Sequence, residues 1–297
     1  MALFSKKTTL VHHITYMGIM TAINLIFIVL ATYVPFLMFL LILLLPFVSA
    51  VVSYYCKKRY YIIYAIASIG LCLIFNISDT IFYVVPAIVT GFMIGLLLEK
   101  KINPFLLILS STIIESALTF ALIPLINLIG NVDIVVTFLT IFKLNEFVYK
   151  TEVTYLFIYF ISLVQCTLTH FVLFGDAKKI GIVVNTEVSS YGPYIVGSEL
   201  MMILSITFSF FYVPLSLIFL AISIYFAIFL LIDLLASKKT LIYVLLGGLL
   251  LVSFFTFAIL YATIKAPLGL LIAIIFPLVI CLVSFVNNYL VKRGNNN

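Results

Sequence analysis

Glu115 is the one carboxylate near the middle of a long apolar segment, since the other Asp and Glu residues lie in polar connections or near segment ends. A charge at the centre of a bilayer costs about 2.5–3.5 kcal/mol on insertion scales, so such residues usually face a bundle interior or a cavity. Thr112, Ser116 and Thr119 share its helical face by spacing. This face predicts a site for a substrate, a cation or a proton. The alternative is a protonated Glu115 that hydrogen-bonds a neighbouring helix for packing.

The apolar segment 154–174 carries a second polar face. Its members recur at steps of three and four residues, and they are Ser162, Gln165, Cys166, Thr169 and His170. We expect this segment to run antiparallel to the segment 103–126. At about 1.5 Å per residue, Gln165 then lies within several Å of the depth of Glu115, and His170 lies nearer the cytoplasmic end.

Asn24 also falls near mid-depth, in the first apolar segment. Together, Glu115, Gln165 and Asn24 predict a polar binding site. The side chains expected beside it are Thr112, Thr119, Thr169 and His170, the last as a candidate relay. The alternative for Gln165, Asn24 and His170 is hydrogen bonding between helices, which contributes only about 0.6–2 kcal/mol per contact.

Small residues at four-residue steps form two ridges along predicted helices. The longer ridge is Ala87, Gly91 and Gly95, and the shorter one is Gly18 and Ala22. Such ridges let another helix approach closely in a membrane. We interpret both as helix-packing faces first, and as docking faces for a partner membrane protein second.

Motifs of several enzyme classes are absent from the sequence. There is no G-x-x-x-x-G-K-[ST] loop for ATP hydrolysis, no H-E-x-x-H and no G-x-S-x-G. The 4 cysteines form no C-x-x-C pair, and His12 and His13 lack a third metal ligand nearby in sequence. We therefore expect no catalysis, no metal and no cofactor.

The elements that position these residues follow from composition. The chain has 297 residues, of which 65% are hydrophobic and 9% charged, whereas a soluble domain carries roughly 25% charged residues. The net charge of +6 is spread in short clusters between apolar runs, which is typical of orientation signals in membrane proteins. No basic stripe is interleaved with aromatic residues, so we expect the lipid bilayer and not nucleic acid as the partner.

Apolar segments of about 20 residues predict an all-α, polytopic transmembrane bundle of about ten spans, within a range of eight to ten. The run 199–236 is too long for one span, so we divide it at Pro214. The segments are 14–33, 36–55, 60–76, 80–98, 103–126, 154–174, the two halves of 199–236, 240–262 and 267–290.

Three parts follow from this division. The first is an N-terminal bundle, 1–126, and the third is a C-terminal bundle, 154–297. Between them, polar residues at three- and four-residue spacing predict an external amphipathic helix in 127–153, lying at the membrane interface. Of the 16 Lys and Arg residues, all but Lys143, Lys150 and Lys265 fall on one side, which predicts that both termini are cytoplasmic and the membrane is the plasma membrane.

Short motifs resemble two related groups of bacterial membrane proteins. The stretch 17–22 and the proline-bounded segment after it resemble the start of the substrate-binding (S) components of energy-coupling-factor transporters. The stretch 83–101 and the run 201–239 resemble the YybS-like proteins, a longer bacterial family that is similar to S components. The resemblance implies a bacterial plasma-membrane protein in which Gly18 and Ala22 contact a transmembrane coupling subunit.

These observations predict a transporter-like or substrate-binding membrane component for a small metabolite, without an ATPase of its own. The interfacial helix, at 132–149, would act as an outer lid over a site between the segments 103–126 and 154–174. The alternative is a structural or regulatory membrane protein that assembles with other helices through Ala87, Gly91 and Gly95.

Overall fold

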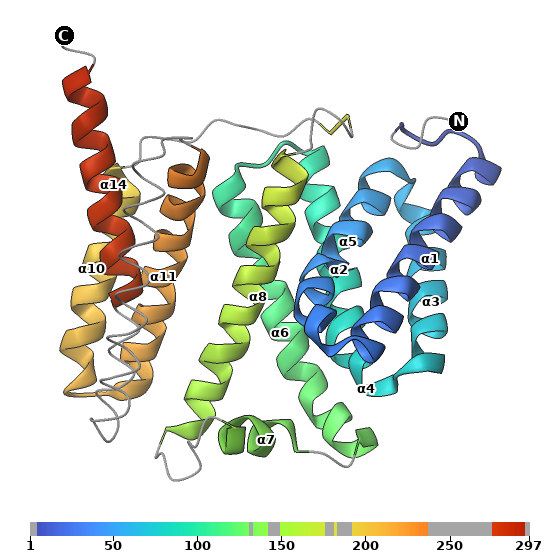
Figure 1. Cartoon of the computed structure of the whole chain (residues 1–297), viewed down its shortest axis with the longest axis horizontal. Coiled ribbons are helices and arrows are strands. Elements are labelled where there is room, and N and C mark those ends of the chain that lie inside the picture. The colour runs from blue at the N-terminus through green and yellow to red at the C-terminus, as the bar shows by residue number, and fades with distance from the viewer. Residues whose placement is uncertain are drawn as a thin grey trace. The chain divides into compact units, whose positions relative to one another are not determined.

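The computed structural model describes residues 5–130, 133–141, 149–175, 181–182, 192–236 and 275–294. Within these ranges the chain is all-helical and contains no strand (Figure 1). The chain forms two compact units: Met1–Phe138 with Phe157–Glu187, and Leu139–Leu156 with Val188–Asn297. Residues from Phe157 onward in the helix that follows the interfacial segment thus belong with the N-terminal helices.

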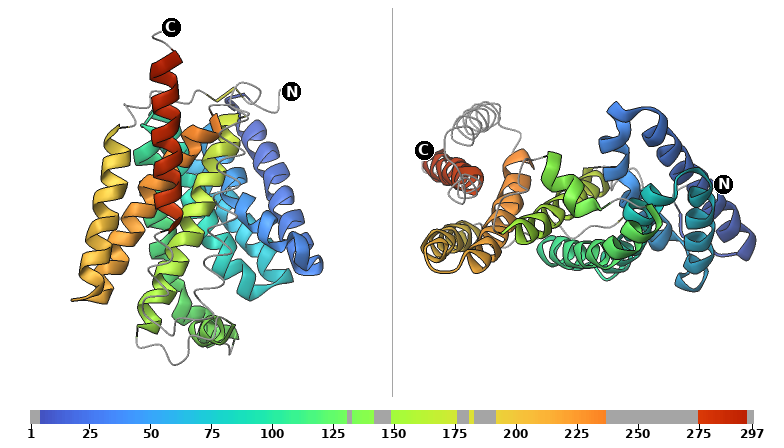
Figure 2. Two further views of the ribbon diagram at one scale, coloured as in Figure 1. Left: turned by 60° about the vertical axis from the view of Figure 1, so that its left-hand side comes forward. Right: turned by 90° about the horizontal axis from the view of Figure 1, so that it is seen from below.

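The described helices are α1 (Leu10–Tyr33), α2 (Pro35–Tyr55), α3 (Lys58–Phe75), α4 (Ile77–Asp79), η1 (Thr80–Val84), α5 (Val85–Glu99), α6 (Pro104–Gly130), α7 (Ile134–Ile141), α8 (Lys150–Gly175), α10 (Gly192–Ser209), α11 (Val213–Ala236) and α14 (Ile275–Gly294). In the first unit, α2 packs against α1 and α5, and α5 packs against α6. In the second unit, α10, α11 and α14 lie side by side, as Figures 1 and 2 show.

Seven helical segments of the described residues are long and apolar enough to cross a membrane. They are α1, α3, the continuous segment Ile77–Glu99, α6, α8, α10 and α11, while α2 and α14 contain the shorter apolar stretches Leu44–Tyr55 and Ile275–Asn287. The chain is therefore compatible with a multi-pass membrane protein. The predicted segment 240–262 lies outside the described residues, so about ten spans and the cytoplasmic position of the termini stay predictions.

Local sequence explains where several helices begin. The Thr9 hydroxyl accepts the His12 amide at 3.3 Å and so caps α1. Pro35 and Pro104 stand at the first positions of α2 and α6, where a missing N–H costs no helical hydrogen bond. Before α6, the Asn103 side chain accepts the Phe105 amide at 2.8 Å.

The long run 199–236 forms two helices, as its division at Pro214 predicts, because α10 ends at Ser209 and α11 begins at Val213. The beginning of α10 differs from the sequence-based boundary: it starts at Gly192, seven residues before 199. Pro193 fits the first turn of a helix. Ser198, which lies before the sequence-based boundary at 199, is buried and donates to the Ser223 carbonyl of α11 at 3.1 Å.

The predicted interfacial segment is described only in part. Its helix α7 covers Ile134–Ile141, and the Asp133 side chain caps it by accepting the Val136 amide at 3.1 Å. The remainder, 142–148, lies outside the described residues. The lid over the site therefore stays a prediction.

Close approach of α2 and α5 depends on two glycines. A Cβ atom built on Gly91 would lie 2.7 Å from the Pro46 carbonyl oxygen, and one on Gly95 would lie 2.7 Å from the Ala50 carbonyl oxygen. Across the same contact, the Ser53 hydroxyl donates to the Phe92 carbonyl at 2.9 Å. The predicted small-residue ridge thus packs against α2 of the same chain.

Candidate functional site

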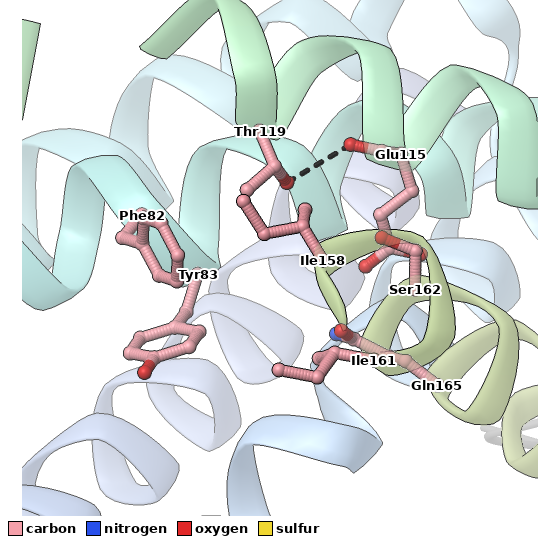
Figure 3. A pocket seen from close by; sticks show the side chains of 8 residues that line it. All are labelled: Phe82, Tyr83, Glu115, Thr119, Ile158, Ile161, Ser162 and Gln165. Carbon is pink, nitrogen blue, oxygen red and sulfur yellow. Dashed lines mark hydrogen bonds between the residues drawn. The ribbon is translucent and has the colours of Figure 1, made fainter. Parts of the chain in front are cut away.

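The polar face of α6 is buried. Glu115 is 2% exposed, and Thr112, Ser116 and Thr119 are buried beside it. The Thr119 hydroxyl donates to the Glu115 carbonyl at 2.9 Å (Figure 3), and the Ser116 hydroxyl donates to the Ile113 carbonyl at 3.1 Å. Bonds of this kind satisfy a hydroxyl on its own helix, so they leave the Glu115 carboxyl group to interact with other elements.

The polar face of α8 meets the polar face of α6. Ser162, Gln165, Cys166, Thr169 and His170 are all buried. The Cys166 thiol donates to Glu115 Oε2, with 2.9 Å between sulfur and oxygen. This contact brings the two predicted faces together at the depth of Glu115.

A small cavity lies between α6, α8 and η1. It is lined by Phe82, Tyr83, Glu115, Thr119, Ile158, Ile161, Ser162 and Gln165 (Figure 3). Its volume is about 20 Å³, and a cavity needs roughly 10–15 Å³ on this measure to hold one water. As it stands, the cavity has room for a water molecule or a single ion, and not for a metabolite.

The aromatic side of the cavity comes from the π-helical turn η1. Pro86 has no N–H, and in a regular α-helix its ring would crowd the Phe82 carbonyl four residues earlier. The chain widens instead, and the Val85 amide bonds to the Thr80 carbonyl five residues back. Such turns occur often at functional sites. Phe82 and Tyr83 were not predicted from the sequence as lining residues. Pro86 is the sequence signal that could have indicated them, because a proline inside a helix disturbs the turn before it.

No described Lys, Arg or His residue forms an ion pair with Glu115. The charged form of a buried carboxyl group costs several kcal/mol unless a positive charge or hydrogen bonds compensate it. A single thiol donor is weak compensation. Glu115 therefore requires a proton or a bound cation when the cavity is closed.

The structure does not bring Asn24 to this cavity. Its side-chain Nδ2 donates to the Tyr64 hydroxyl at 2.6 Å, and that hydroxyl also lies 3.0 Å from the Ser49 hydroxyl. Thr21, on the same face of α1, lies 3.1 Å from Ser68 by the hydroxyl oxygens. The polar face of α1 is therefore directed toward α3, where the hydroxyl groups of Tyr64 and Ser68 lie about one helical turn apart.

The other candidate residues lie close to the cavity without lining it. Thr112, Thr169 and His170 are buried, and the Thr169 hydroxyl and His170 Nδ1 have no hydrogen-bond partner among the described residues. The His170 ring lies 6.1 Å from the Phe174 ring between centroids. A relay role for His170 stays a prediction.

The two small-residue ridges differ in their surroundings. Ala87, Gly91 and Gly95 are buried, and the two glycines face α2. Gly18 and Ala22 are exposed on α1, and a Cβ atom on Gly18 would meet no atom within 4 Å. The exposed ridge is therefore the one that a separate helix could reach.

The described part of the chain contains no group of three or more His, Cys, Asp and Glu residues that could hold a metal ion. The chemistry of the site is thus that of one carboxyl group, one amide, hydroxyls and a thiol beside two aromatic rings. Comparisons of the chain with models of protein families, with curated proteins and with solved structures find no match.

Proposed function

We propose that the protein is a transporter-like or substrate-binding membrane component, with its ligand site at the cavity between α6, α8 and η1. One observation supports this most: Glu115, almost fully buried and in no described ion pair, lines a cavity together with Gln165 and Ser162. Ionisable groups inside membrane bundles are usually functional. The ligand would be a small polar molecule with a cationic or hydrogen-bond-donating group that Glu115 accepts.

The water-sized cavity requires movement before a metabolite can bind. At about 20 Å³, it is far smaller than the roughly 300–1,000 Å³ of pockets for drug-sized ligands. We infer that the described arrangement is a closed state, and that α8 separates from α6 and η1 to admit ligand. The chain has no P-loop motif, so energy would come from a partner or from an ion gradient.

Ion pairs at one end of the first unit support the predicted orientation of the chain in the membrane. Lys6, before α1, and Lys58, at the start of α3, both pair with Glu99 at the end of α5. Three predicted cytoplasmic segments thus meet at one end, as the positive-inside rule requires. We propose the plasma membrane as the location, with both termini cytoplasmic.

Binding measurements on the purified full chain test the site. Calorimetry or thermal shift with a panel of small polar metabolites and monovalent cations should find a ligand whose affinity falls at least tenfold in Glu115→Gln, because the substitution keeps shape and removes charge. Ser116→Ala is the matched control, since Ser116 bonds to its own helix. If Glu115→Gln bound the ligand as tightly as wild type, the site assignment would be wrong.

A structural or regulatory role is the second candidate, and the exposed ridge on α1 favours it. Gly18 and Ala22 lie on the surface of the described structure, and small residues allow close helix contact in membranes. Gly18→Leu would then displace a co-purifying membrane protein, while Gly70→Leu would not. Gly70 is the matched control, because it is also exposed, on α3, with nothing within 4 Å of a Cβ atom. Equal recovery of partners in both variants contradicts this role.

A further inference from the structure

The segment before α1 is fixed to one end of the first unit. The Lys7 amide donates to the Tyr55 carbonyl at 3.1 Å, and Lys6 Nζ donates to the Tyr54 carbonyl. Lys6 Nζ also lies 2.9 Å from Glu99 Oε1. These contacts place the positive charges of the N-terminal segment against the ends of α2 and α5.

Positive charge at this end exceeds the negative charge that the structure offers it. Glu99 pairs with both Lys6 and Lys58. Lys57 and Arg59 are exposed and form no ion pair among the described residues. The Arg59 guanidinium instead donates to the Tyr60 hydroxyl at 2.6 Å. Lys57 and Arg59 can therefore both attract an anion.

Lys7 is unusual among the basic residues here because it is 5% exposed. Its ammonium group lies 4.4 Å from the centroid of the Tyr16 ring. Burial lowers the pKa of Lys7 from its usual value. A lysine that serves only to orient the chain gains nothing from burial, whereas a buried cation stabilises an anion more strongly than an exposed one does.

His13 is the second buried polar group at this end. Its side chain is fully buried, and neither ring nitrogen has a hydrogen-bond partner among the described residues. Its ring lies 5.0 Å from the Tyr60 ring, and the charges of Lys57, Arg59 and Lys7 all act on it. A buried donor without a partner costs about 1–3 kcal/mol, so a ligand that accepts from His13 would remove a cost.

We propose that Lys7, His13, Lys57 and Arg59, here called the His13 cluster, form a binding site for a phosphate-bearing anion. Phosphate suits the cluster because it accepts several hydrogen bonds and carries the charge that three cations can balance. The start of α1 adds its positive dipole end to the same region. The phosphate belongs either to the headgroup of an anionic lipid in the adjoining leaflet or to free phosphate in solution.

The test uses the full chain in nanodiscs, with thermal unfolding followed by a thiol-reactive dye. The dye reports unfolding because the 4 cysteines, Cys56, Cys72, Cys166 and Cys281, are all buried. One arm titrates inorganic phosphate into phosphatidylcholine discs, with sodium chloride of equal ionic strength as the blank. The other arm increases the fraction of phosphatidylglycerol without phosphate. A rise in Tm in either arm supports the site and identifies the source of the phosphate. No rise in either arm overturns the proposal.

Variants separate this site from general surface charge. His13→Phe keeps a ring beside Tyr60 and removes both nitrogens, so the unliganded protein should remain folded and lose at least tenfold in apparent affinity. His12→Phe is the matched control, because His12 is exposed and should respond as wild type does. If His13→Phe and His12→Phe respond alike, the proposal is wrong.

A second pair of substitutions keeps the test valid if His13→Phe does not fold. Lys57→Ala and Arg59→Ala change exposed side chains, and each should lower the apparent affinity about fivefold, as a loss of about 1 kcal/mol per basic residue implies. Lys150→Ala, a basic residue on a different helix, should leave the affinity unchanged. Equal responses in wild type and in the Lys57 and Arg59 variants would overturn the site.

Discussion

At the scale of single residues, the pair Cys166 and Glu115 links the two polar faces. The thiol is buried and donates to the carboxyl oxygen at 2.9 Å. Glu115 also lines a cavity that holds about one water, together with Ser162 and Gln165 of α8. The contact therefore holds α6 and α8 together weakly, as expected for two helices that separate to admit a ligand.

Substitutions at Cys166 should show how far Glu115 depends on this donor. Cys166→Val removes the thiol donor and leaves the buried Glu115 carboxyl oxygen without this hydrogen bond. The loss should lower the free energy of unfolding by about 1–3 kcal/mol. Cys166→Ser keeps a donor of similar size and should cost less. Thermal or denaturant unfolding in detergent measures both. Equal loss in the two variants would show that packing, and not the hydrogen bond, determines the effect.

Gly91 and Gly70 both lie inside apolar helices, but substitution by alanine should have opposite effects on stability at the two positions. Gly91→Ala places a Cβ atom 2.7 Å from the Pro46 carbonyl and 2.8 Å from the Ala50 amide nitrogen, both backbone atoms. We expect a loss of at least about 2 kcal/mol in the free energy of unfolding, since overpacking typically costs 1–3 kcal/mol. Gly70→Ala meets no atom and should stabilise by up to about 1 kcal/mol, because alanine favours helix. Unfolding curves of the two variants make the comparison.

At the scale of elements, the hairpin of α10 and α11 has a defined register. Ser205 and Ser216 donate to each other's carbonyl oxygens, at 2.9 and 2.7 Å. Ser198 and Ser223 do the same at 3.1 and 2.9 Å. The two pairs are seven residues apart on each helix, which is about two turns of an α-helix. The register therefore follows from four serines and a short turn.

A double-mutant cycle on Ser205 and Ser216 should reveal this coupling. Hydrogen bonds between membrane helices contribute about 0.6 kcal/mol on average and up to about 1.7 kcal/mol, and the reciprocal bonds here favour the upper half of that range. Alanine at each position and at both, followed by unfolding, gives the coupling energy. A cycle on Ser205 and Ser209 is the control, since Ser209 bonds to its own helix at Ile206. Coupling near zero in both cycles would contradict the pairing.

The elements also show what sequence could and could not provide. The faces of α6 and α8 could be predicted because three- and four-residue spacing places side chains on one side of a helix. The position of Gln165 at the Glu115 cavity could be predicted because the two residues lie at a similar depth in antiparallel segments. The position of Asn24 could not be predicted, because depth alone does not say which neighbour a helix faces. The π turn that directs Phe82 and Tyr83 to the cavity depends on how the chain relieves the strain of Pro86, which spacing does not encode.

At the scale of the whole molecule, topology determines which side each connection faces. Native cysteines are buried in the described residues, so a membrane-impermeant maleimide should react mainly with introduced ones. We expect Ser5→Cys and Asn296→Cys to react only from the cytoplasmic side, and Phe211→Cys, in the turn between α10 and α11, only from outside. Labelling of intact cells against inverted vesicles measures this. Reaction of positions 5 and 296 from opposite sides would exclude an even number of spans.

The three-residue turn between α10 and α11 has a consequence for synthesis of the protein. Of the seven candidate spans, α10 has the lowest mean hydropathy, and its buried Ser198 and Ser205 donate to carbonyl oxygens of α11. Alone in the translocon, α10 would partition into lipid less readily than the other six candidate spans. We infer that the ribosome must deliver both helices before either leaves the channel, so that the pair is released laterally as one preassembled body.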